Sequence, residues 1–216
     1  MEPRCILLFA KEPRAGRVKT RLARSVGDEQ AARLYEAFLR DTLGSCERVR
    51  SQLIVYFAPA EAVEWFRRLA PAAPLVAQPD GDLGVRLVHG FQSAFERGHR
   101  HVLALGSDAP HVGPDALEEA FRALEAGRGA IGPCADGGYY AIGLSAPAPE
   151  LFEGIAWSSD AAFEQTLERA SGLGIELEIL SASFDVDEPG DLERLRRLLE
   201  NGGASCPFTR AALGVG

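Results

Sequence analysis

The order of apolar and amphipathic segments constrains the fold of this chain more than any other feature of its sequence. Short apolar runs typical of buried strands alternate with longer segments of helical period almost to the end. We expect strands over residues 5–10, 52–57, 74–77, 101–105, 129–132, 139–144 and 175–179. We expect helices over residues 28–46, 60–69, 84–97, 114–126, 160–171 and 189–200. This alternation predicts an α/β protein with a mostly parallel sheet sandwiched by helices.

Length and composition indicate one globular domain. We place that domain at residues 1–200 of the 216, followed by a C-terminal extension over residues 201–216. The extension has a Gly-Gly pair, a proline and no hydrophobic period, so we expect it to be poorly packed. The chain is 46% hydrophobic and 25% charged, as in ordinary soluble proteins. Its formal net charge of -8 argues against a nucleic-acid partner and against a membrane surface.

The cysteines and the N-terminal apolar run bear on the cellular compartment. The four cysteines are widely scattered, and no pair has the spacing of a zinc site or a redox motif. We expect free thiols in a reducing environment. The first apolar run is too short for a signal peptide or a membrane span. We therefore expect a cytoplasmic protein.

A basic loop follows the first predicted strand. Its cations are Lys11, Arg14, Arg17, Lys19 and Arg21, which surround Gly16. Cations gathered in one loop repel one another, and an acidic protein has no need of them for solubility. At the end of a first α/β strand, such a loop favours binding of phosphates. The alternative is a solvated helix entry with surface cations. The loop matches neither a P-loop nor a dinucleotide fingerprint.

Aspartates follow other predicted strands. Asp108 comes after the strand at 101–105, where a carboxylate can bind a hard cation such as Mg²⁺; an Asx-turn or a helix cap is the alternative. Asp185 and Asp187 lie in an extended segment, and we expect them to face opposite ways, one toward the rim and one away. Either could be a second metal ligand, and helix capping is again the alternative.

Three further turns carry polar or aromatic residues. Asp136-Gly137-Gly138 could approach a ligand closely or could form a plain hairpin turn. The turn with Gln78 and Asp82 could contact a nucleobase or substrate, although Asp82 is by default a helix N-cap. Trp157 could line an acceptor pocket beside Ser158, or the serines could cap the next helix. Because ligands bind at the carboxyl ends of strands in such sheets, we expect all these motifs at one rim.

Taken together, the motifs resemble a known family. They are K-x-P-x-x-G-x-V-K-T-R, Q-x-x-G-D-L-G-x-R, G-S-D-x-P, D-G-G-Y-Y, W-S and D-V-D-x-P-x-D-L, in that order between residues 6 and 199. This set resembles the GT-A-fold transferases of the radical-SAM/selenodomain-associated type. It is more distantly similar to molybdenum-cofactor and phospholactate guanylyltransferases and to sugar-acid cytidylyltransferases.

The resemblance implies a nucleotide-diphospho-sugar transferase (GT-A, Rossmann-like) fold and a divalent cation, Mg²⁺ or Mn²⁺. It implies metal ligands at Asp108 and Asp187, and it places Lys19 and Arg21 where nucleotidyltransferases hold the triphosphate. We take Lys19, Arg21 and Asp108 as the catalytic candidates. The candidates for nucleotide or substrate binding are Lys11, Gly16, Arg17, Gln78, Asp82, Asp136, Gly137, Gly138, Trp157 and Ser158.

The leading functional hypothesis is nucleotidyl transfer from a nucleoside triphosphate to a small phosphorylated or carboxylated acceptor. Its partners would be a nucleotide and that acceptor. The basic loop motivates it, because sugar transferases of this fold do not need such a loop. One alternative is glycosyl transfer from a nucleotide sugar. Another is a catalytically silent nucleotide-binding protein, favoured because only Gly16 remains where nucleotidyltransferases usually have two or three glycines.

Overall fold

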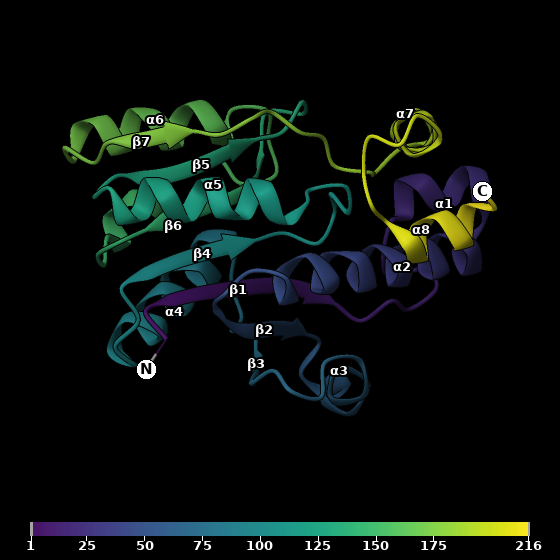
Figure 1. Cartoon of the computed structure of the whole chain (residues 1–216), viewed down its shortest axis with the longest axis horizontal. Coiled ribbons are helices and arrows are strands. Elements are labelled where there is room, and N and C mark those ends of the chain that lie inside the picture. The colour runs from purple at the N-terminus through teal and green to yellow at the C-terminus, as the bar shows by residue number, and fades with distance from the viewer. Residues whose placement is uncertain (1, 216) are drawn as a thin grey trace.

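The core of the molecule is a seven-stranded sheet (Figure 1), seen in a computed structural model that describes residues 2–215. The strand order is β3-β2-β1-β4-β6-β5-β7. The strands are β1 (Arg4–Lys11), β2 (Gln52–Ala58), β3 (Leu75–Ala77), β4 (His101–Leu105), β5 (Gly129–Pro133), β6 (Tyr139–Leu144) and β7 (Leu177–Ile179). Strand β6 runs antiparallel to β4 and β5, and the other neighbours are parallel. The predicted mostly parallel α/β sheet is confirmed.

Helices connect the strands and cover both faces of the sheet. They are α1 (Thr20–Val26), α2 (Asp28–Glu47), α3 (Val63–Leu69), α4 (Leu83–Glu96), α5 (Pro114–Glu125), α6 (Ala162–Gly172), α7 (Pro189–Glu200) and α8 (Pro207–Leu213), with short 3-10 helices η1 (Ala60–Ala62) and η2 (Pro149–Phe152). Helices α1, α7 and α8 gather beyond one end of the sheet, on the right in Figure 1. Within the described residues, no helix has both the length and the apolar character to cross a membrane.

Alternation along the strands produces two hydrophobic cores. On one face of the sheet, Ile6 of β1 belongs to a cluster with Phe38 of α2 and Phe121 of α5. On the other face, the next residue, Leu7, belongs to a cluster with Phe91 of α4. Because successive side chains of a strand point to opposite faces, a strand buried on both sides reads as a continuous apolar run. This explains why the central strands were predictable from sequence.

A tight turn joins the antiparallel pair β5 and β6. Asp136 Oδ1 accepts a hydrogen bond from the Gly138 amide at 3.0 Å, so the hairpin interpretation of this motif is confirmed. Gly137 has φ +86, and a Cβ there would lie 2.0 Å from the backbone oxygen of Asp160. The glycine is therefore required by close approach of another backbone segment, the one that leads into α6.

The C-terminal tail is ordered by a helix that the sequence analysis missed, so the prediction of a poorly packed extension is wrong. Helix α8 packs against α2. Asp41, a buried residue of α2, accepts hydrogen bonds from the backbone amides of Phe208 at 3.1 Å and Thr209 at 2.8 Å. Cys206 and Thr209 are buried. A helix of seven residues is too short to show a clear hydrophobic period, and its capping acid lies far away in the sequence.

Candidate active site

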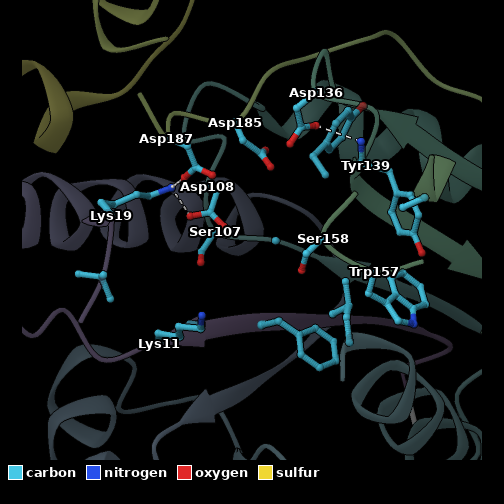
Figure 2. Close-up of a pocket in the computed structure, with 18 of the residues that line it drawn as sticks. Lys11, Lys19, Ser107, Asp108, Asp136, Tyr139, Trp157, Ser158, Asp185 and Asp187 are labelled. Carbon is cyan, nitrogen blue, oxygen red and sulfur yellow. Dashed lines mark hydrogen bonds and ion pairs between the residues drawn. The ribbon is translucent and has the colours of Figure 1, made fainter. Parts of the chain in front are cut away.

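A pocket of about 960 Å³ lies at the carboxyl ends of the parallel strands (Figure 2). Most predicted site residues line it, namely Lys11, Arg17, Lys19, Arg21, Gln78, Asp82, Asp108, Asp136, Gly138, Trp157, Ser158 and Asp187. They follow β1, β3, β4, β5 and β7 or belong to the segment that leads into α6. Gly16 and Gly137 are outside the lining, since each serves a turn with positive φ beside the pocket. The expected convergence on one rim therefore holds for the chain as described.

Lys19 lies at the centre of the charged end of the pocket. It precedes α1 with left-handed backbone (φ 48), and its side chain is only 3% exposed. Its ammonium forms ion pairs with Asp108 and, at 2.7 Å, with Asp187. Burial lowers the pKa of Lys19, but the two carboxylates outweigh burial and hold the pKa above its ordinary value. The ammonium is thus held as a charged link between two strand ends.

Two aromatic rings of helix α2 lie against the Lys19 ammonium. The ammonium lies 5.6 Å from the ring centroid of Tyr35 and 5.9 Å from that of Phe38. The Tyr35 hydroxyl also joins two strand ends, because it accepts a hydrogen bond from the Lys11 amide at 3.1 Å and lies 2.8 Å from Ser107 Oγ. Burial raises the pKa of Tyr35 to about 12, so the phenol stays neutral. Sequence reasoning missed Tyr35, whose only signal was its place in a helical period.

A backbone hydrogen bond brings the far end of the chain to Asp108. The Val186 amide donates to the Asp108 carbonyl at 2.9 Å. Asp185 and Asp187 both line the pocket, while Val186 between them is buried. The expectation that these aspartates face opposite ways is wrong. Residues two apart in an extended segment share a face, so both carboxylates point to the same side, as Figure 2 shows.

Asp185 is the most perturbed acid of the site. Burial and the nearby Asp108 carboxylate raise the pKa of Asp185 to about 7. The Cys134 thiol donates to Asp185 Oδ1 at 3.2 Å. Cys134, Asp136 and Asp185 offer ligand atoms that all lie within 4.8 Å of one another. Negative charge is therefore concentrated on this side of the pocket.

The cations of the basic loop divide into two groups. Lys19 is paired as described, Arg14 pairs with Glu12, and Arg21 pairs with Glu188 at 3.1 Å. Lys11 and Arg17 line the pocket, and no ion-pair partner for either is found among residues 2–215. The sequence argument overlooked the acids that partner three of the five cations. Two positive charges remain directed at the pocket without an internal counter-ion.

In the turn after β3, Gln78 fixes the position of an arginine side chain by a hydrogen bond. Gln78 Nε2 donates to the carbonyls of Ala10 at 3.1 Å and Tyr56 at 2.8 Å, and its Oε1 accepts from Arg86 Nη1 at 3.1 Å. Asp82 Oδ1 accepts from the Val85 amide at 3.0 Å, which confirms its default interpretation as the N-cap of α4. Gln78 therefore positions Arg86, which sequence reasoning quoted within its motif but did not select.

Aromatic side chains form the other end of the pocket. Trp157 and Tyr139 meet edge to face, with ring centroids 6.3 Å apart. Figure 2 shows them on the opposite side of the pocket from Lys19 and Asp187. Ser158, next to Trp157, has left-handed backbone with φ 64. Strain of this kind in a non-glycine residue is found most often at functional sites. The pocket thus has a charged end and an aromatic end.

This sheet order, with its pocket at the strand ends, defines the fold of nucleotide-diphospho-sugar transferases and nucleotidyltransferases. A solved structure from Desulfovibrio desulfuricans G20, provisionally named a nucleotide-diphospho-sugar transferase, is 36% identical, with 99% of this chain and 94% of that chain covered and a TM-score of 0.93. The family model described as "Uncharacterized protein conserved in bacteria (DUF2064)" matches residues 42–159. The chain belongs to this family.

More distant structures share the fold. 4-Diphosphocytidyl-2C-methyl-D-erythritol synthase is 15% identical over 92% of this chain and 99% of that chain, with a TM-score of 0.60. CMP:2-keto-3-deoxy-manno-octonic acid synthetase, solved with CTP, is 14% identical over 92% of this chain and 99% of that chain, with a TM-score of 0.53. At such identities the likeness establishes the fold alone. No curated protein matches the chain.

Proposed function

We propose that this protein is a metal-dependent nucleotidyltransferase that uses a nucleoside triphosphate and a small phosphorylated or carboxylated acceptor. The observation that carries the proposal is the meeting of Lys19 with Asp108 and Asp187 in a pocket that two further unpaired cations line. Two structures of the same fold bear the names of a cytidylyl-compound synthase and a CMP-sugar-acid synthetase, and the second holds CTP. These names support a nucleotide as the donor.

The unpaired cations favour a triphosphate. Lys11 and Arg17 line the pocket beside the charged end, and Arg21 adds a guanidinium that is 61% exposed. A nucleoside triphosphate brings more negative charge than a nucleotide sugar, and Arg and Lys both bind phosphate oxygens strongly. In this proposal Lys11, Arg17 and Arg21 hold the β- and γ-phosphates, while Lys19 keeps the carboxylates of Asp108 and Asp187 in place.

The donor set fits a hard divalent cation. Asp108, Asp185 and Asp187 direct carboxylate oxygens to one side of the pocket, and Mg²⁺ or Mn²⁺ prefers such ligands. Burial and, second to it, the neighbouring Asp108 carboxylate raise the pKa of Asp185, and a bound cation would favour its ionised form. Asp108 and Asp187 are the ligands we propose, with Asp185 beside them. A bound metal ion would neutralise part of the negative charge of the phosphates.

The residues of the chain would then act by position and charge. An acceptor oxygen would attack the α-phosphorus, a new P–O bond would form, and the bond to the bridging oxygen would break to release pyrophosphate. Arg21 and Arg17 would stabilise the charge that develops on that leaving group. No protein nucleophile is needed, since phosphoryl chemistry of this kind depends mostly on alignment and electrostatics.

Glycosyl transfer from a nucleotide sugar is the second candidate. The provisional name of the Desulfovibrio structure favours it, and so does the aromatic end of the pocket, where Trp157 and Tyr139 could face a sugar ring. Both candidates share the nucleotide and the metal. They differ in how much phosphate charge the basic loop must bind.

Calorimetric titration separates these functions. GTP, CTP, UDP-glucose and UDP-N-acetylglucosamine would each be titrated with Mg²⁺ or Mn²⁺ into the full chain. We expect a triphosphate to bind at least about tenfold more tightly than either nucleotide sugar, a difference of about 1.4 kcal/mol. Tight binding confined to the nucleotide sugars would reject nucleotidyl transfer in favour of glycosyl transfer.

Two further assignments belong to this proposal. The four cysteines are free and buried, in keeping with a reducing compartment, and we place the enzyme in the cytoplasm. The association with radical-SAM proteins remains a prediction from sequence resemblance.

A further inference from the structure

We propose that Arg86 selects the base of the bound nucleotide, and that it accepts guanine or cytosine and discriminates against adenine. The inference rests on the proposed function, because it requires a nucleotide in the pocket. It deepens that function by naming the class of base and the residue that recognises it.

The Arg86 side chain is held in place yet incompletely hydrogen-bonded. Its Nη1 donates to Gln78 Oε1, and Gln78 is itself fixed to the carbonyls of Ala10 and Tyr56. Arg86 Nε is buried, and within the described residues it has no hydrogen-bond partner. A buried donor without an acceptor is energetically unfavourable. Because Arg86 lines the pocket, a ligand bound there is the source that we propose for the missing acceptor.

The surroundings of Arg86 suit a flat aromatic ligand. Arg86 comes from the beginning of α4, two residues after Gly84. A Cβ on Gly84 would lie 2.7 Å from Trp157 Nε1, so the glycine lets the indole pack against the first turn of the helix. Phe9 lines the same pocket. Trp157 lies across the pocket from Lys19 in Figure 2, so phosphates at the charged end would leave the base near α4.

The free edge of the guanidinium defines which bases fit. With Nη1 engaged by Gln78, the Nε–H and Nη2–H groups form two parallel donors on one edge, and no hydrogen bond from either is found within residues 2–215. Such a fork matches two adjacent acceptors. Guanine offers O6 and N7, as in its common pairing with arginine, and cytosine offers O2 and N3. Adenine places a donor beside N7 and has no adjacent pair of acceptors.

A phosphate could also engage a guanidinium fork, and the test must distinguish the two sources of acceptors. Arg86→Lys keeps the positive charge but loses the planar fork. Calorimetry with GTP, CTP, ATP and inorganic tripolyphosphate, each with Mg²⁺, would be performed on the wild type and on Arg86→Lys. Arg68→Lys, at an exposed position of α3 outside the pocket, is the matched control.

We expect the wild type to bind GTP or CTP about 10- to 100-fold more tightly than ATP, the range of one bidentate base contact. In Arg86→Lys, the affinity for the preferred triphosphate should fall to that for ATP. The affinities of this variant for ATP and tripolyphosphate should equal those of the wild type. Arg68→Lys should bind every ligand as the wild type does. Equal losses for all triphosphates and tripolyphosphate would assign Arg86 to phosphate and overturn the inference. Equal affinities of the wild type for GTP, CTP and ATP would overturn the inference and leave the proposed function intact. Failure of every nucleotide to bind would reject both.

Discussion

Lys19 Nζ lies 2.7 Å from Asp187 Oδ1, although 168 positions separate the two residues along the chain. The same ammonium pairs with Asp108 at the end of β4. One buried cation therefore links the N-terminal loop to the middle and to the far end of the sequence.

Replacing Lys19 by methionine should lower stability and make it depend on metal. The change leaves Asp108 and Asp187 close together without their shared cation. Because these carboxylates are 44% and 36% exposed, water screens part of the effect, and we expect a loss of about 1–3 kcal/mol. Urea unfolding with and without Mg²⁺ measures it, and Mg²⁺ should stabilise the variant more than the wild type. Arg33→Met, which removes an exposed pair with Glu29, should change little. An unaltered midpoint for Lys19→Met would contradict the structural role.

Asp108→Asn and Asp187→Asn should each weaken Mn²⁺ binding at least about tenfold, because each removes a charged ligand from a site that prefers carboxylate oxygens. Binding can be followed by the paramagnetic resonance signal of free Mn²⁺. Asp160→Asn is the control, since Asp160 lines the same pocket but is exposed in the turn before α6. If metal-dependent nucleotide binding survives in Asp108→Asn, the catalytic interpretation fails and a silent binding protein is favoured.

Gly137→Ala should destabilise the protein by about 2 kcal/mol or more, because the position has positive φ and no space for a Cβ. The Gly137 carbonyl also accepts a hydrogen bond from the Phe163 amide at 2.9 Å, so the β5–β6 turn and the start of α6 should loosen together. Thermal unfolding measures the change. Gly172→Ala, in α6 with open space around it, should be neutral or slightly stabilising. Equal effects of the two substitutions would refute this account of the turn.

His111 should make stability fall in mild acid. Burial, helped by the Arg194 charge, lowers the pKa of His111 from 6.5 to about 4. An imidazole with a depressed folded-state pKa contributes stability above pH 6.5 and loses it as the pH falls toward 4. Between pH 7.5 and pH 5 the contribution is about 2 kcal/mol. Urea unfolding across this range should show a shallower pH dependence in His111→Gln, which replaces the imidazole that contacts the Ser183 hydroxyl with a side chain that does not titrate. Parallel curves for the two proteins would count against the prediction.

The fold was predictable because each central strand is buried on both faces. Ile6 and Leu7 enter different cores, so β1 appears in the sequence as an unbroken apolar run. The antiparallel course of β6 was anticipated only through the hairpin alternative for Asp136-Gly137-Gly138, since the direction of a strand leaves no mark on its period. Helix α8 was not predicted because Asp41, which accepts hydrogen bonds from its first amides, is remote in sequence.

The site was predictable where polar residues directly follow strands. Asp108 was found in this way, because the carboxyl ends of parallel strands meet at one edge. Asp187 does not directly follow a strand, and the family resemblance, not its position, singled it out over Asp185. The shared face of Asp185 and Asp187 also follows from strand geometry, and the prediction misapplied it. The Tyr35 hydroxyl contacts Ser107, 72 positions away, so the local pattern carried no signal of its role. Arg86 contacts Gln78, only 8 positions away in the same motif, and was quoted there without being selected.

The docking of α8 on α2 has a consequence for the whole molecule. Asp41, which anchors α8, belongs to the same helix as Tyr35 and Phe38, the two rings beneath the Lys19 ammonium. Helix α8 thus packs against the helix that carries the two rings beneath the Lys19 ammonium. Shortening the C-terminus, or attaching a bulky tag to it, would loosen the charged end of the pocket, more than a hundred residues upstream in the sequence.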